Sequence, residues 1–338
     1  MPITKKSKQT PVEISIIVPI WNDEGSIVPF IASLFASIKP EVSNFEVIFC
    51  ADPSKDNTHQ IIRELSLKDP RIKALFFATR VGQPASTMAG LAHCSGQAAI
   101  VIDVDLQDPI ELLPTMIDLW RNGKKLIIPR RVSRSGEPMT KKLTAAIGYS
   151  FLSRFGNAPI PKNTGDFRLM DRSVIERVLS LRESHVFLRG LVAIVDQDPF
   201  LIDFVRPPRP IGKTKYNKWF GGIRSGLNGI VSYSTALLDF IIIIGLALAT
   251  LSLIIGSKYL VYKVTGHYIP PGNTQLFVMV TFIGSMQLIA IGVMGLYVGR
   301  IFEEVKERPR WFVGEGIGFK NIDFTDSLRT QRMFPETK

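Results

Sequence analysis

Residues 98–109, Ala98-Ala99-Ile100-Val101-Ile102-Asp103-Val104-Asp105-Leu106-Gln107-Asp108-Pro109, join a short apolar run to a group of acidic residues. The apolar run predicts a buried strand. Asp103 and Asp105 follow it two positions apart, so both carboxylates can hold one hard divalent cation from the same side. Mg²⁺ prefers a few carboxylates together with phosphate oxygens. The stretch therefore predicts a cation site suited to clamping a diphosphate.

The chain before this stretch repeats the same change from apolar strand to polar turn. Three more strands are expected at residues 14–19, 45–50 and 72–77, and helices at 27–38, 58–66, 84–94 and 109–120. Such repeated strand–helix units predict an α/β fold with a doubly wound, mostly parallel sheet. Ligands of these sheets bind at the carboxyl ends of the strands. Polar groups follow all four strands at those ends: residues 21–24, residues 52–56, Arg80 with Gln83, and the acidic group after residue 102.

Net charge and hydropathy separate the chain into regions. The 338 residues carry a formal charge of +11, and 46% of them are hydrophobic. Residues 204–238 hold no acidic residue but six basic ones: Arg206, Arg209, Lys213, Lys215, Lys218 and Arg224. A basic stretch beside apolar segments favours an anionic lipid surface or an anionic lipid-linked substrate. No basic module studded with aromatic residues supports a nucleic acid partner.

Two apolar segments are long enough to cross a bilayer. Residues 240–257 and 275–299 are uncharged, and about 20 residues span the hydrocarbon core. A buried helix of a soluble protein is the alternative, and we favour two membrane-spanning helices. More basic residues lie before the first segment and after the second than in the connection between them. Because basic residues favour the cytoplasmic side, we expect both termini in the cytoplasm.

Several motifs resemble one enzyme family. Residues 16–24, IIVPIWNDE, resemble the opening motif of family 2 glycosyltransferases with the GT-A fold. Residues 51–58, ADPSKDNT, resemble their Asp-Asp-Gly-Ser-x-Asp-x-Thr turn, with Ala51 and Pro53 as departures. DVDLQDP at 103–109 is similar to the motif of the branch that glycosylates polyprenyl phosphates, which includes dolichyl-phosphate mannose synthase-like and GtrB-like members. Residues 165–169, 187–190 and 212–216 also match that branch.

The resemblance implies a GT-A domain followed by a two-helix transmembrane hairpin. The expected parts are a disordered N-terminus (1–12), a cytoplasmic catalytic domain (13–216), an amphipathic juxtamembrane segment (217–234), a first membrane helix (235–258), an outer loop (259–274), a second membrane helix (275–300) and a cytoplasmic C-terminal tail (301–338). The expected location is the bacterial inner membrane. Gly292, Gly295 and Gly299 give weak support to a homo-oligomer.

The resemblance also implies roles for individual residues. Asp103, Asp105 and Gln107 would surround Mg²⁺ or Mn²⁺ on the donor diphosphate. The nucleotide sugar would contact Pro19, Trp21, Asn22, Glu24, Asp52, Arg80, Gln83 and Asp103, with Asp52 and the turn at 19–24 holding uracil and ribose. Arg131 and Arg134 would bind either the acceptor phosphate or the donor diphosphate, with Arg168 and Lys215 as further candidates for the acceptor phosphate. Asp166 would orient groups near the acceptor. The catalytic set is therefore Asp105, Asp166, Arg131 and the residue at position 158.

Position 158 departs from the pattern of similar transferases. An Asp commonly precedes the Ile/Val-Pro step there, and this chain has Ala158. Alanine neither accepts a proton nor holds a cation. Either the role is dispensable in this chain or the chain is an inactivated version, and we favour the second interpretation.

The predicted activity is inverting transfer of a hexose, preferably glucose from a UDP-sugar, to a polyprenyl phosphate of the undecaprenyl type at the cytoplasmic membrane face. A membrane-anchored sugar-nucleotide-binding protein without turnover is one alternative. A processive polysaccharide synthase is another. It is disfavoured because two spans do not easily form a translocation channel and the sequence has no Gln-x-x-Arg-Trp motif.

Overall fold

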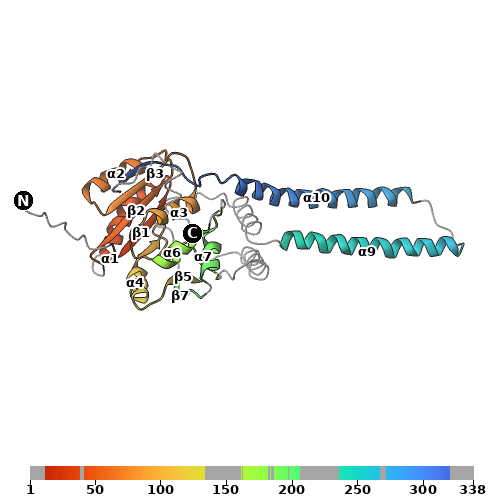
Figure 1. Cartoon of the computed structure of the whole chain (residues 1–338), viewed down its shortest axis with the longest axis horizontal. Helices are drawn as coiled ribbons and strands as arrows, with labels where there is room; N and C mark the ends of the chain where they lie inside the picture. Colours follow the sequence, from red (N-terminus) through yellow and green to blue (C-terminus); the bar gives the residue numbers. More distant parts are fainter. Residues whose placement is uncertain are drawn as a thin grey trace, which may run out of the picture. The chain divides into compact units, whose positions relative to one another are not determined.

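The computed structural model describes residues 12–38, 42–133, 161, 163–181, 183, 186–196, 198–205, 236–266 and 272–319. The chain divides into two compact units. The first comprises Met1–Tyr149, Ala158–Tyr216 and Arg308–Lys338, and the second comprises Ser150–Asn157 and Asn217–Glu307. The first unit contains a mixed sheet with helices, and the second contains two long helices (Figure 1).

The sheet of the first unit has eight described strands in the order β7-β5-β6-β4-β1-β2-β3-β8. They are β1 (Ile14–Ile20), β2 (Phe45–Ala51), β3 (Ile72–Phe77), β4 (Ala98–Val101), β5 (Leu126–Ser133), β6 (Arg168–Asp171), β7 (Phe200–Val205) and β8 (Val313–Ile317). The helical elements of this unit are α1 (Glu24–Ile38), α2 (Thr58–Lys68), α3 (Gln83–His93), the 3₁₀ turn η1 (Ile110–Leu112), α4 (Leu113–Arg121), α6 (Arg172–Ser180) and α7 (Leu188–Val195). The predicted α/β class is confirmed.

The four central strands of the sheet are parallel. β1 pairs in parallel with β2 and β4, and β2 pairs in parallel with β3. Every residue of β1 and β2 is buried, as expected for parallel strands covered on both faces. Helix α1 covers this core with Ile27, Phe30, Leu34 and Ile38, which recur at helical spacing. The strand–helix alternation seen in the sequence thus corresponds to the centre of the sheet.

The winding of the sheet reverses beside β1. The chain moves outward from β1 to β2 and β3, and then returns to place β4 on the other side of β1. Crevices at such switch points, outside the carboxyl ends of the strands, are where open α/β sheets bind ligands. The turn after β1 and the acidic turn after β4 follow neighbouring parallel strands, so both emerge at this edge of the sheet.

The C-terminal part of the chain returns to the sheet. β8 pairs antiparallel with β3 and forms one edge. Trp311 just before it is buried, and Glu315 forms a two-pronged ion pair with Arg63 of α2. The sequence analysis treated residues 301–338 as a tail and did not anticipate this strand, since VGEGI has little strand propensity.

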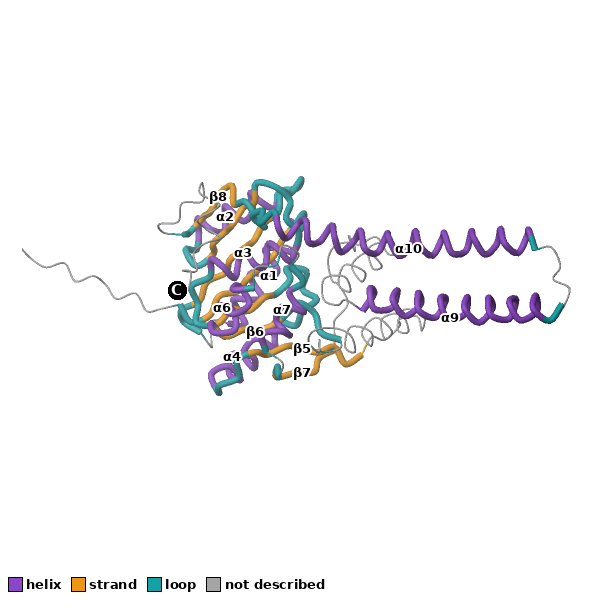
Figure 2. Tube along the Cα trace, turned by 45° about the vertical axis from the view of Figure 1, so that its right-hand side comes forward, coloured by secondary structure: helices purple, strands orange, loops and turns teal. Residues whose placement is uncertain are grey.

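The second unit contains α9 (Ala236–Val264) and α10 (Asn273–Val305). The two helices contact each other and run in opposite directions (Figures 1 and 2). Among the described helices, one segment, Phe282–Val305, is long and apolar enough to cross a membrane, while the apolar part of α9, Phe240–Ile255, is shorter. Both helices extend past the boundaries expected at residues 258 and 300. Their exposed apolar side chains include Leu253 and Leu288, a surface typical of contact with lipid or another protein.

A buried carboxylate ties together the amino ends of the central strands. Glu46 of β2 is 1% exposed and accepts hydrogen bonds from Ser15 Oγ at 2.6 Å, the Ser95 amide at 2.6 Å and Lys73 Nζ at 2.5 Å. Burial alone would raise the pKa of Glu46, but the hydrogen bonds from Lys73, Ser15 and Ser95 outweigh it and hold that pKa below its usual value of 4.5. This group therefore stabilises the fold when it is ionised.

We expect Glu46→Gln to lower the free energy of unfolding at pH 7 by about 2–3 kcal/mol, because Lys73 and two donors lose a charged acceptor. A folded-state pKa below the unfolded value means that the stabilisation is complete above about pH 4.5 and is lost as the pH falls further. Urea unfolding at pH 7 and at pH 3.5 tests this, with the exposed Glu64→Gln as control. An equal loss of stability at both pH values would contradict it.

Candidate functional site

The turns that follow β1 and β2 are joined into one surface. The Asn22 amide donates to Ser54 Oγ at 3.0 Å, and the Lys55 amide donates to Asn22 Oδ1 at 2.7 Å. The Asn57 amide donates to Glu24 Oε2 at 2.9 Å. Asn22 has a left-handed backbone, with φ of 49°, a conformation that asparagine tolerates better than most residues. The first two polar groups predicted from the sequence are therefore joined to each other by hydrogen bonds.

An aromatic and cationic pair lies beside these two turns. The Arg80 guanidinium, which follows β3, stacks over the Trp21 ring at 3.6 Å from the ring centroid. Trp21 Nε1 donates to the Pro53 carbonyl at 3.2 Å. The stack offers a flat, positively charged surface next to the turn after β1. Pro19 is buried inside β1, so it shapes the turn from beneath.

Asp52 holds the turn that begins α3. Its side chain is nearly buried, and its two oxygens accept hydrogen bonds from the backbone amides of Val81, at 2.9 Å, and Gly82, at 3.0 Å. Gly82 has φ of 81° and is the N-cap of α3. Gln83, the first residue of that helix, donates from Nε2 to Asp103 Oδ1 at 2.8 Å. The Asp52 side chain, the backbone at the start of α3 and the Gln83 side chain thus connect the end of β2 to the end of β4.

The acidic turn after β4 has a strained backbone. Leu106 has φ of 58°, which is uncommon for a bulky residue and points to a turn whose shape is fixed by its surroundings. Asp105 is 7% exposed and accepts a hydrogen bond from the Gln107 amide at 3.1 Å. Asp103 is partly exposed on the same turn.

The donors of this turn fit a hard divalent cation. Asp103 and Asp105 supply carboxylate oxygens and Gln107 supplies an amide oxygen. In the part of the chain that the structure describes, no group of three or more His, Cys, Asp and Glu residues forms a metal cage. Mg²⁺ usually takes only one or two carboxylates and completes its shell with phosphate oxygens and water, so this incomplete set matches a cation that is bound together with a diphosphate.

A second charged cluster contains Asp166 and three arginines. Arg189 contacts the Asp166 carboxylate through Nε at 2.9 Å and Nη2 at 3.3 Å. Burial raises the pKa of Asp166, but the charges of Arg189, Arg168 and Arg131 together with the Arg189 hydrogen bond lower it below its ordinary value. Arg131 also lies 4.0 Å from Asp108, between Nη2 and Oδ1. The Asp166 carboxylate is therefore ionised near neutral pH.

Arg168 serves the structure of that cluster. It is 1% exposed and donates to the Gly165 carbonyl at 2.8 Å and the Asp166 carbonyl at 3.1 Å. Burial lowers its pKa to about 10. These two hydrogen bonds hold the turn that contains Asp166. The contact of Arg168 with an acceptor phosphate stays a prediction.

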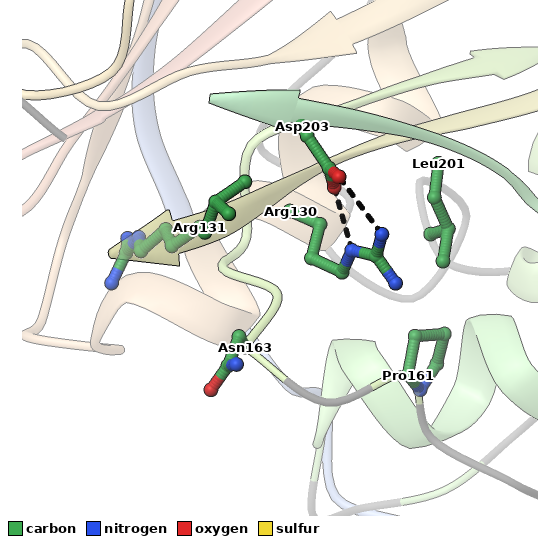
Figure 3. A pocket seen from close by; sticks show the side chains of 7 residues that line it. Arg130, Arg131, Pro161, Asn163, Leu201 and Asp203 are labelled. Atoms are coloured by element: carbon green, nitrogen blue, oxygen red, sulfur yellow. Dashed lines mark hydrogen bonds and ion pairs between the residues drawn. The ribbon is translucent and has the colours of Figure 1, made fainter. Parts of the chain in front are cut away.

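Arg131 also lines a pocket of about 410 Å³ at the carboxyl end of β5. Figure 3 shows its lining: Arg130, Arg131, Val132, Pro161, Asn163, Leu201 and Asp203. Arg130 forms a two-pronged ion pair with Asp203 of β7, at 2.6 and 2.9 Å. The wall thus combines cationic, anionic, polar and apolar side chains, and the charge of Arg130 is paired with that of Asp203.

The structure brings most of the predicted residues to one edge of the sheet, in two clusters. Arg134, Ala158 and Lys215 lie outside the described residues. Sequence reasoning assigned no role to Arg189, although the motif Phe187-Leu188-Arg189-Gly190 contains it, and it did not single out Asn163 or Asp203. The motif was a usable signal for Arg189. Asp203 offered none, because its partner Arg130 lies far away in the sequence.

Comparison with known proteins gives consistent matches. The family described as Glycosyl transferase family 2 matches residues 15–179. The SfII prophage-derived bactoprenol glucosyl transferase of Shigella flexneri is 37% identical over 304 residues, covering 89% of this chain and 97% of that protein. The prophage bactoprenol glucosyl transferase homolog of Escherichia coli (strain K12) is 35% identical over 302 residues, covering 89% and 98%. A solved glucosyl-3-phosphoglycerate synthase from Mycobacterium tuberculosis aligns with a TM-score of 0.42 and 19% identity over 60% of this chain and 73% of that one, too distant to bear on the ligands of this site.

Removing the two hydrogen bonds from Arg189 to the Asp166 carboxylate should destabilise the second cluster. We expect Arg189→Ala to cost about 1–2 kcal/mol of unfolding free energy at pH 7, since a half-buried carboxylate loses two charge-assisted hydrogen bonds. Arg189→Lys keeps the positive charge but not the pair of hydrogen bonds, and it should lower the free energy of unfolding by less. Because Arg189 lowers the Asp166 pKa, the cost should shrink as the pH falls below about 3.8, where the carboxylate is protonated in the unfolded chain. Denaturant titrations of the three proteins measure this, and identical losses for alanine and lysine would refute it.

Proposed function

The chain belongs to glycosyl transferase family 2, and from that premise we propose that it transfers glucose from UDP-glucose to a polyprenyl phosphate of the undecaprenyl type. One observation carries the proposal. The identity of 37% to a bactoprenol glucosyl transferase extends over 304 residues and 97% of that relative, far beyond the family domain that ends at residue 179. Relatives of this similarity and coverage support a shared donor and acceptor chemistry.

The donor would bind at the carboxyl end of β1. The Trp21–Arg80 stack offers a surface for the nucleoside, next to the turn that contains Asn22 and Glu24. The diphosphate would lie at the acidic turn, where Asp103, Asp105 and Gln107 would hold Mg²⁺ or Mn²⁺. When bound, the cation would neutralise the charge that develops on the departing UDP.

The acceptor phosphate would lie near Arg131, whose guanidinium matches phosphate oxygens. An acceptor phosphate oxygen attacks the anomeric carbon of glucose from the side opposite UDP. The new carbon–oxygen bond forms as the bond from that carbon to the UDP oxygen breaks, so the configuration inverts and UDP leaves with the electron pair. The phosphate oxygen is already anionic near neutral pH, and a strong base is less necessary than for a sugar hydroxyl. Positioning and charge neutralisation then supply most of the acceleration.

The sheet supports an even number of membrane crossings. The strands from β1 to β7 precede α9, whereas β8 follows α10, and β8 pairs with β3 in the same sheet. A chain that leaves one side of a membrane through the candidate span Phe282–Val305 must therefore cross a second time. α9 is the available segment: it is 29 residues long, and its part Phe240–Ile255 is apolar. We infer a two-helix hairpin in the inner membrane, with the sheet on the cytoplasmic side.

A binding protein without turnover is the second candidate, and Ala158 is the observation that favours it. Arg134 and Lys215 keep their proposed roles at the acceptor phosphate. Assembly into a homo-oligomer also remains a prediction, as Gly292, Gly295 and Gly299 of α10 face open space.

The direct test is transfer of radiolabelled glucose from UDP-glucose to undecaprenyl phosphate with Mg²⁺, by the full chain and by Ala158→Asp. We expect labelled lipid from the variant, at a higher rate than from the parent, because the variant regains the carboxylate that similar transferases commonly carry at this position. Activity only in the variant would show that the parent lacks an essential carboxylate. Equal activity would show that position 158 is dispensable. UDP binding without transfer in either protein would overturn the proposed reaction.

Cysteine labelling tests the hairpin. Val264→Cys, at the end of α9, should react with a membrane-impermeant maleimide in intact bacteria, and Arg308→Cys, after α10, should react only after the membrane is opened. The native Cys50 and Cys94 are buried and give a low background. Labelling of both positions from outside, or of neither, would contradict two crossings.

A further inference from the structure

A series of hydrogen bonds runs from the end of β2 to the end of β4 through the start of α3. We propose that Gln83 is a positioning residue that orients the Asp103 carboxylate toward the cation, and that Asp52 acts through Gln83 by fixing the first turn of α3. The inference rests on the proposed function, because it assumes a donor diphosphate bound with Mg²⁺ or Mn²⁺. In this proposal Asp52 and Gln83 position other groups and do not contact the nucleotide sugar directly.

The surroundings of Asp52 favour this assignment. Both of its oxygens accept backbone hydrogen bonds, from Val81 and Gly82, and the residue is 4% exposed. Little of the carboxylate surface is left for a nucleoside. The amides that it holds lie at the N-terminus of a helix, where backbone donors have no partner within the helix. Gly82 adopts φ of 81°, a left-handed conformation that glycine reaches without strain, and the carboxylate holds this turn at the start of α3.

Gln83 connects the first turn of α3 to the acidic turn after β4. Its carbonyl accepts hydrogen bonds from Ser86 Oγ at 3.0 Å and Thr87 Oγ1 at 2.9 Å, which fixes its backbone in the first turn of α3. Its side chain then reaches Asp103 Oδ1 at 2.8 Å. A carboxylate ligand that is held by a hydrogen bond has fewer orientations to lose when it binds a cation.

The chemistry of the amide also matters. Gln83 donates a hydrogen bond without carrying a positive charge, so Asp103 keeps its full negative charge for the cation. Each carboxylate oxygen has two lone pairs, and the bond from Gln83 takes up one of them on Asp103 Oδ1. A neutral donor at this position orients the ligand without competing electrostatically with the metal.

The test measures binding and does not require turnover. The affinity for Mn²⁺ in the presence of UDP is measured by electron paramagnetic resonance, and the affinity for UDP without metal by calorimetry. We expect Gln83→Leu to weaken Mn²⁺ binding about tenfold, the lower end for loss of a residue that orients a metal ligand, and to leave metal-free UDP affinity within about twofold. Gln60→Leu is the matched control, since Gln60 on α2 donates to the exposed Glu64 at 3.0 Å and should change neither value.

Asp52→Asn tests the second part of the proposal. An asparagine places an amide group against the donors of Val81 or Gly82 and should weaken Mn²⁺ binding as Gln83→Leu does. If Asp52 acts through Gln83, the double variant should lose no more than the stronger single variant. Weaker UDP binding without metal in Asp52→Asn, with additive losses in the double variant, would show instead that Asp52 contacts the nucleoside.

The outcomes separate this inference from the proposed function. Wild-type protein that binds no UDP with Mn²⁺ would remove the proposed donor site and the inference together. Wild-type protein that binds both, with Gln83→Leu indistinguishable from it, would overturn the positioning role alone.

Discussion

The parallel pairing of β1 with β2 on one side and β4 on the other is the constraint on which the site depends. Since all three strands run in the same direction, the turns that follow them must emerge at one edge of the sheet. The winding of the sheet reverses beside β1, and open α/β sheets bind their ligands at such reversals. Complete burial of β1 and β2 fixes the register of the strands, and with it the position of each polar turn.

The turns themselves contain strained backbone, and other contacts offset the cost of that strain. Asn22, Leu106 and Asn163 all have positive φ, and each lies in a turn at this edge. Such conformations cost about 1–3 kcal/mol each and persist only where the surroundings impose them. Hydrogen bonds between the turns supply part of that support, as in the bond from the Lys55 amide to Asn22. Turns held this way lose little freedom when a ligand binds, which favours a site that positions reacting groups.

The sequence was sufficient for the centre of the sheet and insufficient for its edges. Apolar runs followed by helical patterns predicted β1 to β4, because parallel strands buried on both faces leave a continuous local signal. β8 was missed because its pairing with β3 joins residues far apart in the chain and its own residues have low strand propensity. In the same way, the acidic turn was predicted from its spacing, whereas the contact between Arg189 and Asp166 was not. An ion pair between distant residues has no signature in either local segment, and a motif shows only that a residue belongs to a pattern.

The pairing of β8 also changes how the long helices relate to the enzyme domain in the chain. They follow β7 in the sequence, yet β8, which completes the sheet, comes after them. In sequence, α9 and α10 are therefore an insertion between two strands of one sheet. The exposed ion pair of Arg63 with Glu315 contributes little by itself. The β3–β8 backbone hydrogen bonds and the buried Trp311 are the stronger attachments. β3 leads directly to Arg80 and Gly82, and the Ala78 amide bonds to the Phe312 carbonyl at 2.9 Å. The segment that returns from the helices thus supports the strand whose end carries part of the proposed donor site, and loss of that segment would loosen the site from its edge inward.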